Sequence, residues 1–187
     1  MRTSAAGRVA AILAAAGLTA TAACSASLGP IAVSRADDPD LTATVLRVVD
    51  GDTVDVVDDS RGRLRIRLIG VDSPEVHKPG YGIGCWGPEA SEFARSALTG
   101  QRVAIVTDPS QDTHDRYGRT LAYVERAGGW DFSVEAARAG AAKSYVYGRR
   151  PATLTPQIQA AEAEAQRAQR GLWGPPCYGH TDSTPVK

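Results

Sequence analysis

The fold is decided by residues 63–75, which read RLRIRLIGVDSPE. From Arg63 to Leu68, arginines alternate with aliphatic residues, and this period of two predicts a β-strand with one apolar and one cationic face. The strand is expected to run to Val71, with Asp72 and Glu75 just past its end. The stretch therefore places three guanidinium groups on one strand face and two carboxylates immediately after it.

Outward from this strand, the chain predicts further strands and helices in a mixed order. Alternation and turn residues predict strands at 41–49, 53–57, 103–107 and 119–125. Helical spacing predicts a helix from Pro88 to Leu98 and another over 133–139 that Gly140 closes. A third is expected with Thr155 as its cap and Gly171 as its stop. About five strands with three helices make a small α+β domain.

Composition narrows the class of protein. The 187 residues hold 21 Lys plus Arg against 21 Asp plus Glu, with 43% hydrophobic and 22% charged residues. Such a chain can build a core and is unlike a disordered one. A net charge of zero argues against a wholly basic nucleic-acid binder. The length allows one domain with a tail.

The first 36 residues differ from the rest. They carry Arg2, Arg8 and Arg35 but no acid, and only small or apolar residues run from 9 to 23, as in a secretory signal. A transmembrane helix is the rival interpretation, but the run falls short of the roughly 18 to 20 apolar residues that a span needs. Cleavage is expected either after residue 36 or after residue 23, where a lipobox-like TAAC would leave Cys24 lipidated. Both predict export, to the medium or to the outer side of the cell envelope.

Removing residues 1–36 leaves 18 basic against 21 acidic residues, so the mature chain is mildly acidic. It retains Cys85 and Cys177. In an exported protein, two cysteines are most simply a disulfide, here one that ties the chain's end to a loop near its middle. Two unrelated thiols are the alternative, and a metal site of Cys and His lacks the ligand spacing.

Three clusters could carry chemistry. Asp52, at the turn between two strands, together with Asp72 and Glu75, suits a hard cation such as calcium. The segment 115–119, DRYGR, combines two guanidinium groups with an aromatic ring, which suits a nucleotide. Residues 145–147, YVY, repeat that combination with the arginines after them. Taken singly, each has an ordinary structural explanation: a hairpin turn or strand exit, a solvated turn, and a packed edge.

The clusters occur in an order that resembles the staphylococcal nuclease (thermonuclease) family. The resemblance runs from about Val45 to Trp173. The segments that carry it are VDGDT at 49–53, IRLIGVDSPE at 66–75, GPEA at 87–90, DRYGR at 115–119 with LAY at 121–123, YVY at 145–147 and GLW at 171–173.

This resemblance implies an OB-fold, a five-stranded β-barrel with three α-helices. It implies a calcium-dependent endo/exonuclease that hydrolyses phosphodiester bonds of DNA and RNA to 3'-phosphate products. Carried over by position, calcium is held by the side chains of Asp52 and Asp72 and the carbonyl of Ser73. The catalytic residues are Arg67, Glu75 and Arg119. The substrate-binding residues are Arg116, Tyr117, Tyr145 and Tyr147.

Some positions depart from the family pattern. Ser73 stands where Thr is usual, Arg116 stands where the best-known member has Lys, and the segment before Tyr145 is one residue shorter. That member also lacks cysteines, although Cys85 and Cys177 fall where a clasp between loop and tail is plausible.

Two other functions remain open: a non-catalytic nucleic-acid-binding OB module of the cell envelope, and a lipid-anchored protein that uses calcium structurally. The expected organisation is a signal at 1–36 (or 1–23), a linker at 37–44, a nuclease-like domain at 45–174 and a tail at 175–187. The expected partner is single-stranded or locally melted DNA and RNA. No protein partner is evident, and a monomer is expected.

Overall fold

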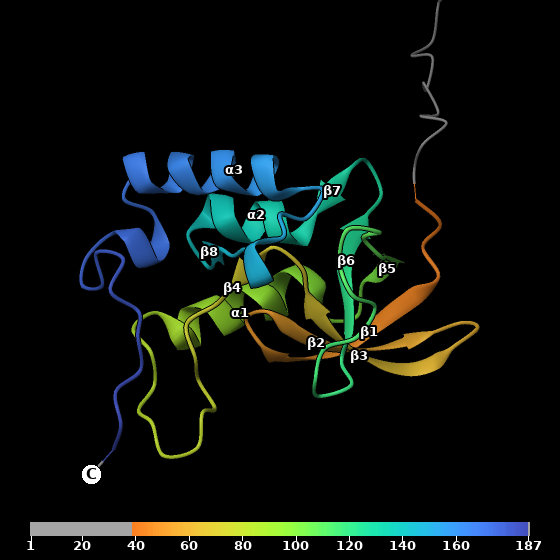
Figure 1. Cartoon of the computed structure of the whole chain (residues 1–187), viewed down its shortest axis with the longest axis horizontal. Helices are drawn as coiled ribbons and strands as arrows, with labels where there is room; N and C mark the ends of the chain where they lie inside the picture. The colour runs from red at the N-terminus through yellow and green to blue at the C-terminus, as the bar shows by residue number, and fades with distance from the viewer. Residues whose placement is uncertain (1–38, 187) are drawn as a thin grey trace, which may run out of the picture. The chain divides into compact units, whose positions relative to one another are not determined.

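Five strands close into a barrel within residues 39–186, the part of the chain that the computed structural model describes. The predictions for residues 1–36, including the signal and Cys24, lie outside it. The barrel strands are β1 (Ala43–Asp50), β2 (Thr53–Asp58), β3 (Gly62–Leu68), β5 (Arg102–Val106) and β6 (Thr120–Arg126). They pair in the order β3-β2-β1-β5-β6, and a parallel pairing between β3 and β6 closes the ring (Figure 1). The predicted OB-fold is confirmed.

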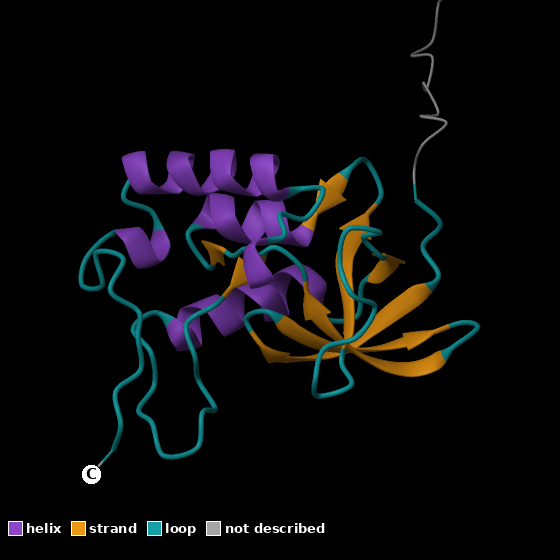
Figure 2. Ribbon diagram, in the orientation of Figure 1, coloured by secondary structure: helices purple, strands orange, loops and turns teal. Residues whose placement is uncertain are grey.

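Three helices gather on one side of the barrel (Figure 2). Helix α1 (Gly87–Leu98) packs against β1, while α2 (Phe132–Ala139) packs against α3 (Thr155–Arg167). A short strand β4 (Val71–Asp72) pairs with β8 (Lys143–Ser144), and β7 (Trp130–Asp131) pairs antiparallel with the end of β6. Two single-turn 3-10 helices complete the described part: η1 (Tyr147–Arg149) and η2 (Gly171–Trp173).

The alternation on β3 is confirmed. Ile66 and Leu68 are buried in the core, whereas Arg63 and Arg65 are exposed. The strand is shorter than predicted because it ends at Leu68 and the chain turns before β4. Gly70 occupies this turn with φ +82°, and a Cβ there would lie 2.5 Å from Cδ1 of Ile158. The turn therefore favours glycine for its positive φ, and the tip of the Ile158 side chain packs closely against it.

The predicted cap of α3 is wrong. Thr155 is the first helical residue, and its Oγ1 accepts a hydrogen bond from the N–H of Ala152 at 2.9 Å instead of capping the helix. An apolar stripe of Ile158, Ala161, Ala165 and Ala168 is expected from helical spacing; the first three are buried, whereas Ala168 lies beyond the helix end and is exposed. The helix ends at Arg167, ahead of the glycine expected to stop it. Within 39–186, no helix is long and apolar enough to cross a membrane.

The predicted disulfide is present. Cys85 and Cys177 are bonded, with their Cα atoms 5.8 Å apart, and the bond joins the loop before α1 to the C-terminal segment. Two backbone hydrogen bonds join the same segments further along: the N–H of Gly82 donates to the carbonyl of Thr184 at 2.8 Å, and the N–H of Val186 donates to the carbonyl of Gly80 at 2.9 Å. The C-terminal segment thus lies along the loop that precedes α1.

Candidate active site

The turn between β1 and β2 places Asp52 on the floor of the site. Its side chain is largely buried; Oδ2 accepts a hydrogen bond from the backbone N–H of Ser73 at 3.0 Å, and Oδ1 accepts one from the Thr53 hydroxyl at 3.0 Å. The neighbouring Gly51 permits this approach, because a Cβ there would lie 2.7 Å from Cβ of Ser73. Two segments about 20 residues apart, each predicted to supply metal ligands, are therefore in direct contact.

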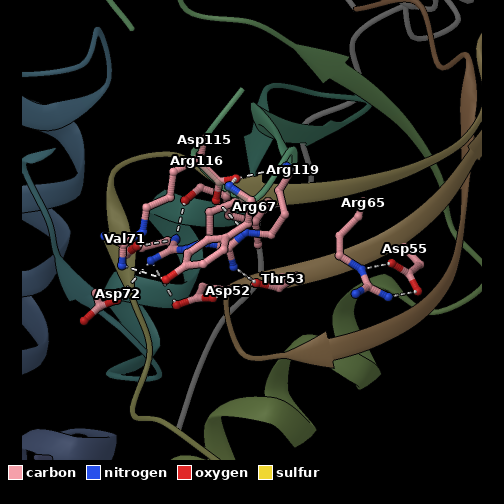
Figure 3. Close-up of polar contacts among 12 residues, drawn as sticks. Asp52, Thr53, Asp55, Arg65, Arg67, Val71, Asp72, Asp115, Arg116 and Arg119 are labelled. Carbon is pink, nitrogen blue, oxygen red and sulfur yellow. Dashed lines mark hydrogen bonds and ion pairs between the residues drawn. The ribbon is translucent and has the colours of Figure 1, made fainter. Parts of the chain in front are cut away.

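Arg67, near the end of β3, links the two predicted metal carboxylates. Its Nη2 donates to Oδ1 of Asp72 at 2.9 Å and lies 3.2 Å from Oδ2 of Asp52 (Figure 3). Its Nη1 donates to the carbonyls of Leu68 and Val71, at 2.7 and 2.8 Å. A guanidinium held by oxygens on both of its terminal nitrogens has a fixed orientation, as a group that recognises a phosphate requires.

Acidic groups crowd together in this pocket. The pKa of Asp50 is raised to about 6, mainly by burial and also by the charges of Asp52 and Glu75, against the lowering effect of a hydrogen bond from Gly51. The pKa of Asp72 is also raised, first by desolvation and then by the charge of Asp52. Carboxylates whose pKa values are raised by burial and by neighbouring acidic groups are stabilised as anions when a cation binds beside them.

The residues present fit a calcium ion. Two carboxylates and a backbone carbonyl, from Asp52, Asp72 and Ser73, are hard oxygen donors of the kind that calcium prefers. The buried hydroxyl of Ser73 has no hydrogen-bond partner within residues 39–186, so an oxygen beside these donors is also unsatisfied. In the described chain, no three His, Cys, Asp or Glu side chains converge as a metal cluster. A cation here therefore needs carbonyl or water ligands as well as the two carboxylates.

Glu75 lies in the loop after β4, half-buried at the edge of the same pocket. Its backbone is fixed because its carbonyl accepts a hydrogen bond from the N–H of Gly84 at 2.7 Å. Its carboxylate accepts only a long bond, 3.1 Å, from the N–H of His77 among the contacts recorded for residues 39–186. The side chain thus keeps acceptor capacity for a water molecule.

Arg119 lies just before β6, on the opposite side of the pocket. Its Nε donates to Oδ2 of Asp115 at 2.6 Å, and its Nη1 lies 3.3 Å from the Thr53 hydroxyl. Since β6 runs parallel to β3 with Arg67 opposite Leu121, the fold brings Arg119, two residues before Leu121, close to Arg67 (Figure 3). Asp115 fixes one edge of the guanidinium and leaves the other edge facing the site.

The predicted substrate residues surround a groove next to this pocket. Tyr117, Tyr145 and Tyr147 are exposed, at 68%, 45% and 61%. The guanidinium carbon of Arg116 lies 4.8 Å from the ring centroid of Tyr117, and an N–H of Arg116 donates to the Tyr117 hydroxyl at 2.6 Å. Exposed rings with cationic neighbours form surfaces on which nucleobases stack.

The structure brings all the predicted site residues into two adjoining hollows. The metal pocket is lined by Asp52, Asp72, Ser73, Glu75, Arg67 and Arg119. The aromatic groove is lined by Arg116, Tyr117, Tyr145, Tyr147, Arg67, Asp72 and Arg119. Because Arg67, Asp72 and Arg119 line both, a phosphate at this shared rim can have its base in the groove.

The chain matches known proteins over the same region. The family model described as staphylococcal nuclease homologue matches residues 65–175. The thermonuclease of Staphylococcus hyicus is 39% identical over 132 residues, covering 71% of this chain and 75% of that protein. The thermonuclease of Staphylococcus intermedius is 39% identical over 145 residues, covering 78% and 83%. An uncharacterized endonuclease of Escherichia coli is 36% identical over 134 residues, covering 72% and 78%.

The chain belongs to the staphylococcal nuclease family. It is therefore a hydrolase of the nuclease class. Within this nuclease, Asp115 is a site residue whose role the sequence did not reveal, although an Asp that opens a turn four residues before Arg119 is a recognisable pattern. The sequence also did not predict that the C-terminal segment contributes to the site, where Thr181, Asp182 and Ser183 line the metal pocket. Cys177, which tethers that segment, was the only signal of its position.

Proposed function

We propose that this protein is a calcium-dependent nuclease that hydrolyses phosphodiester bonds in single-stranded or locally melted DNA and RNA, leaving 3'-phosphate ends. One observation supports this most: Arg67, on β3, and Arg119, just before β6, line the rim that the metal pocket shares with the aromatic groove. Phosphodiester hydrolysis spreads negative charge over the phosphoryl oxygens in the transition state. Two guanidinium groups with fixed orientations stabilise that charge better than flexible lysines do.

Asp52, Asp72 and the carbonyl of Ser73 would hold the calcium ion. When bound, calcium would supply a Lewis acid that polarises a phosphoryl oxygen. Arg67, whose Nη2 lies against both of these carboxylates, is positioned to donate to the phosphate beside them.

Glu75 orients a water molecule and accepts its proton as the water attacks phosphorus. The half-buried position of Glu75 in the metal pocket, with only one recorded acceptor contact on its carboxylate, supports this assignment. Breakage of the bond from phosphorus to the 5' oxygen leaves the phosphate on the 3' side. Tyr117, Tyr145 and Tyr147 stack on the flanking bases, and Arg116 contacts a phosphate.

Export from the cytoplasm is part of the proposal. A disulfide between Cys85 and Cys177 persists in oxidising compartments, and the basic, apolar start of the sequence is typical of a signal. The proposed location is therefore the medium or the outer side of the envelope, with Cys24 as a candidate lipid anchor.

The test is cleavage of single-stranded DNA and RNA by the mature protein in calcium and in chelator. We expect cleavage only in calcium, and products that a polymerase extends only after phosphatase treatment. Arg119→Ala is expected to lower kcat by about a hundredfold or more, whereas Arg126→Ala, at the far end of the strand that follows Arg119 and outside both hollows, serves as the control. Binding without cleavage by the wild type would instead favour a nucleic-acid-binding module.

A further inference from the structure

The solvent face of β3 carries more positive charge than the proposed hydrolysis uses. Besides Arg67, both Arg63 and Arg65 point to this face, and both are exposed. Residues i and i+2 of a strand lie about 6.7 Å apart on one face. Three guanidinium groups therefore follow one another in a line that starts at the rim of the site.

The middle member of this line already belongs to the site's surroundings. Arg65 lines the metal pocket together with Arg67 and Arg119, although it contacts neither of the predicted metal carboxylates. Figure 3 shows Arg65 apart from the cluster around Arg67, with Asp55 beside it. The hollow that holds the scissile phosphate is thus continuous with the β3 surface.

Asp55 holds the arginines of this surface in place without neutralising them all. It accepts hydrogen bonds from Nε and Nη2 of Arg65, at 2.7 and 3.1 Å, and from Nε of Arg47 at 2.8 Å. One carboxylate is shared by two guanidinium groups, so the cluster keeps a net positive charge. Arg65 and Arg47 stay 47% and 64% exposed and have further N–H groups to donate.

We propose that Arg65 and Arg63 bind successive phosphates of the nucleic-acid strand that enters the site at Arg67. We name this line of three side chains, Arg63, Arg65 and Arg67, the β3 phosphate track. This inference rests on the proposed function, and it adds a binding site for the strand beyond the reacting phosphate. The spacing of the arginines is of the order of the step between consecutive phosphates in an extended single strand, and cationic grooves that follow a backbone bind such strands.

The track makes a prediction about substrate length. A dinucleotide with a single phosphate occupies only the Arg67 end, whereas an oligonucleotide of eight residues reaches all three arginines. Contacts with the additional phosphates should therefore strengthen binding of the longer strand only. Each lost phosphate contact should also lower the slope of log Kd against log salt concentration by about 0.7.

The experiment measures binding of labelled thymidine oligonucleotides, two and eight residues long, in chelator so that the strand stays intact. Arg65→Gln is expected to weaken binding of the eight-residue strand about three- to tenfold, Arg63→Gln by a similar or smaller factor, and neither should alter binding of the dinucleotide. Asp55→Asn should tighten binding of the eight-residue strand, because it removes a negative charge and releases two arginines. If this ion-pair cluster has a purely structural role, both Arg65→Gln and Asp55→Asn should weaken binding of the eight-residue strand.

Arg95→Gln is the matched control. The side chain of Arg95 is 47% exposed, the same as that of Arg65, and is also paired with a carboxylate, but it lies on α1 and lines neither hollow. Equal effects of Arg65→Gln on both strand lengths, or no effect on either, would overturn the track. If the wild type leaves DNA intact in calcium while the length-dependent losses appear, the proposed hydrolysis fails and the track stands.

Discussion

Asp115 holds Arg119 by both of its carboxylate oxygens. Oδ2 accepts the hydrogen bond from Nε at 2.6 Å, and Oδ1 accepts one from the backbone N–H of Arg119 at 3.0 Å. Burial opposes ionisation of this carboxylate, but these hydrogen bonds outweigh burial and lower the pKa of Asp115. The guanidinium at the site is thus oriented by a group that is itself outside the reaction.

Asp115→Asn should therefore reduce kcat about ten- to a hundredfold, because an amide nitrogen opposite Nε misorients the guanidinium. KM should change less, since Arg119 keeps its charge. The measurement is steady-state kinetics on single-stranded DNA in calcium. Asp59→Asn, which breaks an equally short pair with Arg102 on the surface, is the control and should retain wild-type kcat. An Asp115→Asn enzyme with unchanged kcat would contradict the positioning role.

The disulfide should contribute strongly to stability because it closes a long loop. Cys85 and Cys177 are 92 residues apart in sequence, and cross-links of such loops stabilise by about 2 to 4 kcal/mol. The double substitution to Ser should lower the free energy of unfolding by this amount, as measured by urea denaturation. A reductant should destabilise the wild type similarly and leave the variant unaffected. Equal stability of the oxidised wild type and the variant would show that the bond adds nothing.

Because of Asp131, the free energy of unfolding should fall as the pH rises. This buried residue caps α2 by accepting a hydrogen bond from the N–H of Val134 at 2.9 Å, while its Oδ2 has no partner in the described part of the chain; burial raises its pKa to about 7 from 3.8. The folded state binds the proton more tightly than the unfolded state, so folding stability is lost between about pH 4 and pH 7.

Asp131→Asn keeps a capping oxygen without the charge. Above pH 7 it should be more stable than the wild type, by on the order of 2 kcal/mol, and the difference should vanish near pH 4. Asp131→Ala, which also loses the cap, should be about 1 kcal/mol less stable than the Asn variant at every pH. Unfolding curves across this pH range provide the measurement, and a pH-independent difference between wild type and Asn variant would refute the assignment.

The close approach of two backbone segments explains why glycine is needed at position 171. Gly171 has φ +55°, and a Cβ there would lie 2.2 Å from the carbonyl oxygen of Gly140. Gly171→Ala should therefore destabilise the protein by about 3 kcal/mol or more. Gly148 has a similar φ, +59°, but open space around it, so Gly148→Ala should cost only about 1 kcal/mol. Similar losses in both variants would mean that backbone conformation, and not the contact, sets the cost.

The sequence predicted most reliably what depends on local periodicity. The alternation from Arg63 to Leu68 predicted a strand with one buried and one cationic face, because side chains of a strand alternate between its faces. The resemblance then supplied the barrel and the site residues that the structure brings together. Neither source revealed how Arg67 bridges Asp52 and Asp72, since that contact depends on how the β1–β2 turn packs against β4.

What the sequence could not predict depends on distant packing. Ile158 of α3 packs against the turn at Gly70 that ends the strand, and Thr155 turns its hydroxyl to Ala152 instead of capping its helix. The C-terminal segment lines the metal pocket because a disulfide and hydrogen bonds such as that from Gly82 to Thr184 hold it there. No periodicity marks contacts of this kind.

The most direct test of the central claim is the single-turnover rate of cleavage of one labelled single-stranded DNA by the wild type and by Glu75→Gln, each in calcium and in chelator. The account predicts cleavage by the wild type in calcium alone, and a rate about a hundred- to ten-thousandfold lower for Glu75→Gln in calcium. Glu89→Gln, an exposed position on α1, controls for the loss of a carboxylate. Equal rates for the wild type and Glu75→Gln, or undiminished wild-type cleavage in chelator, would contradict the account.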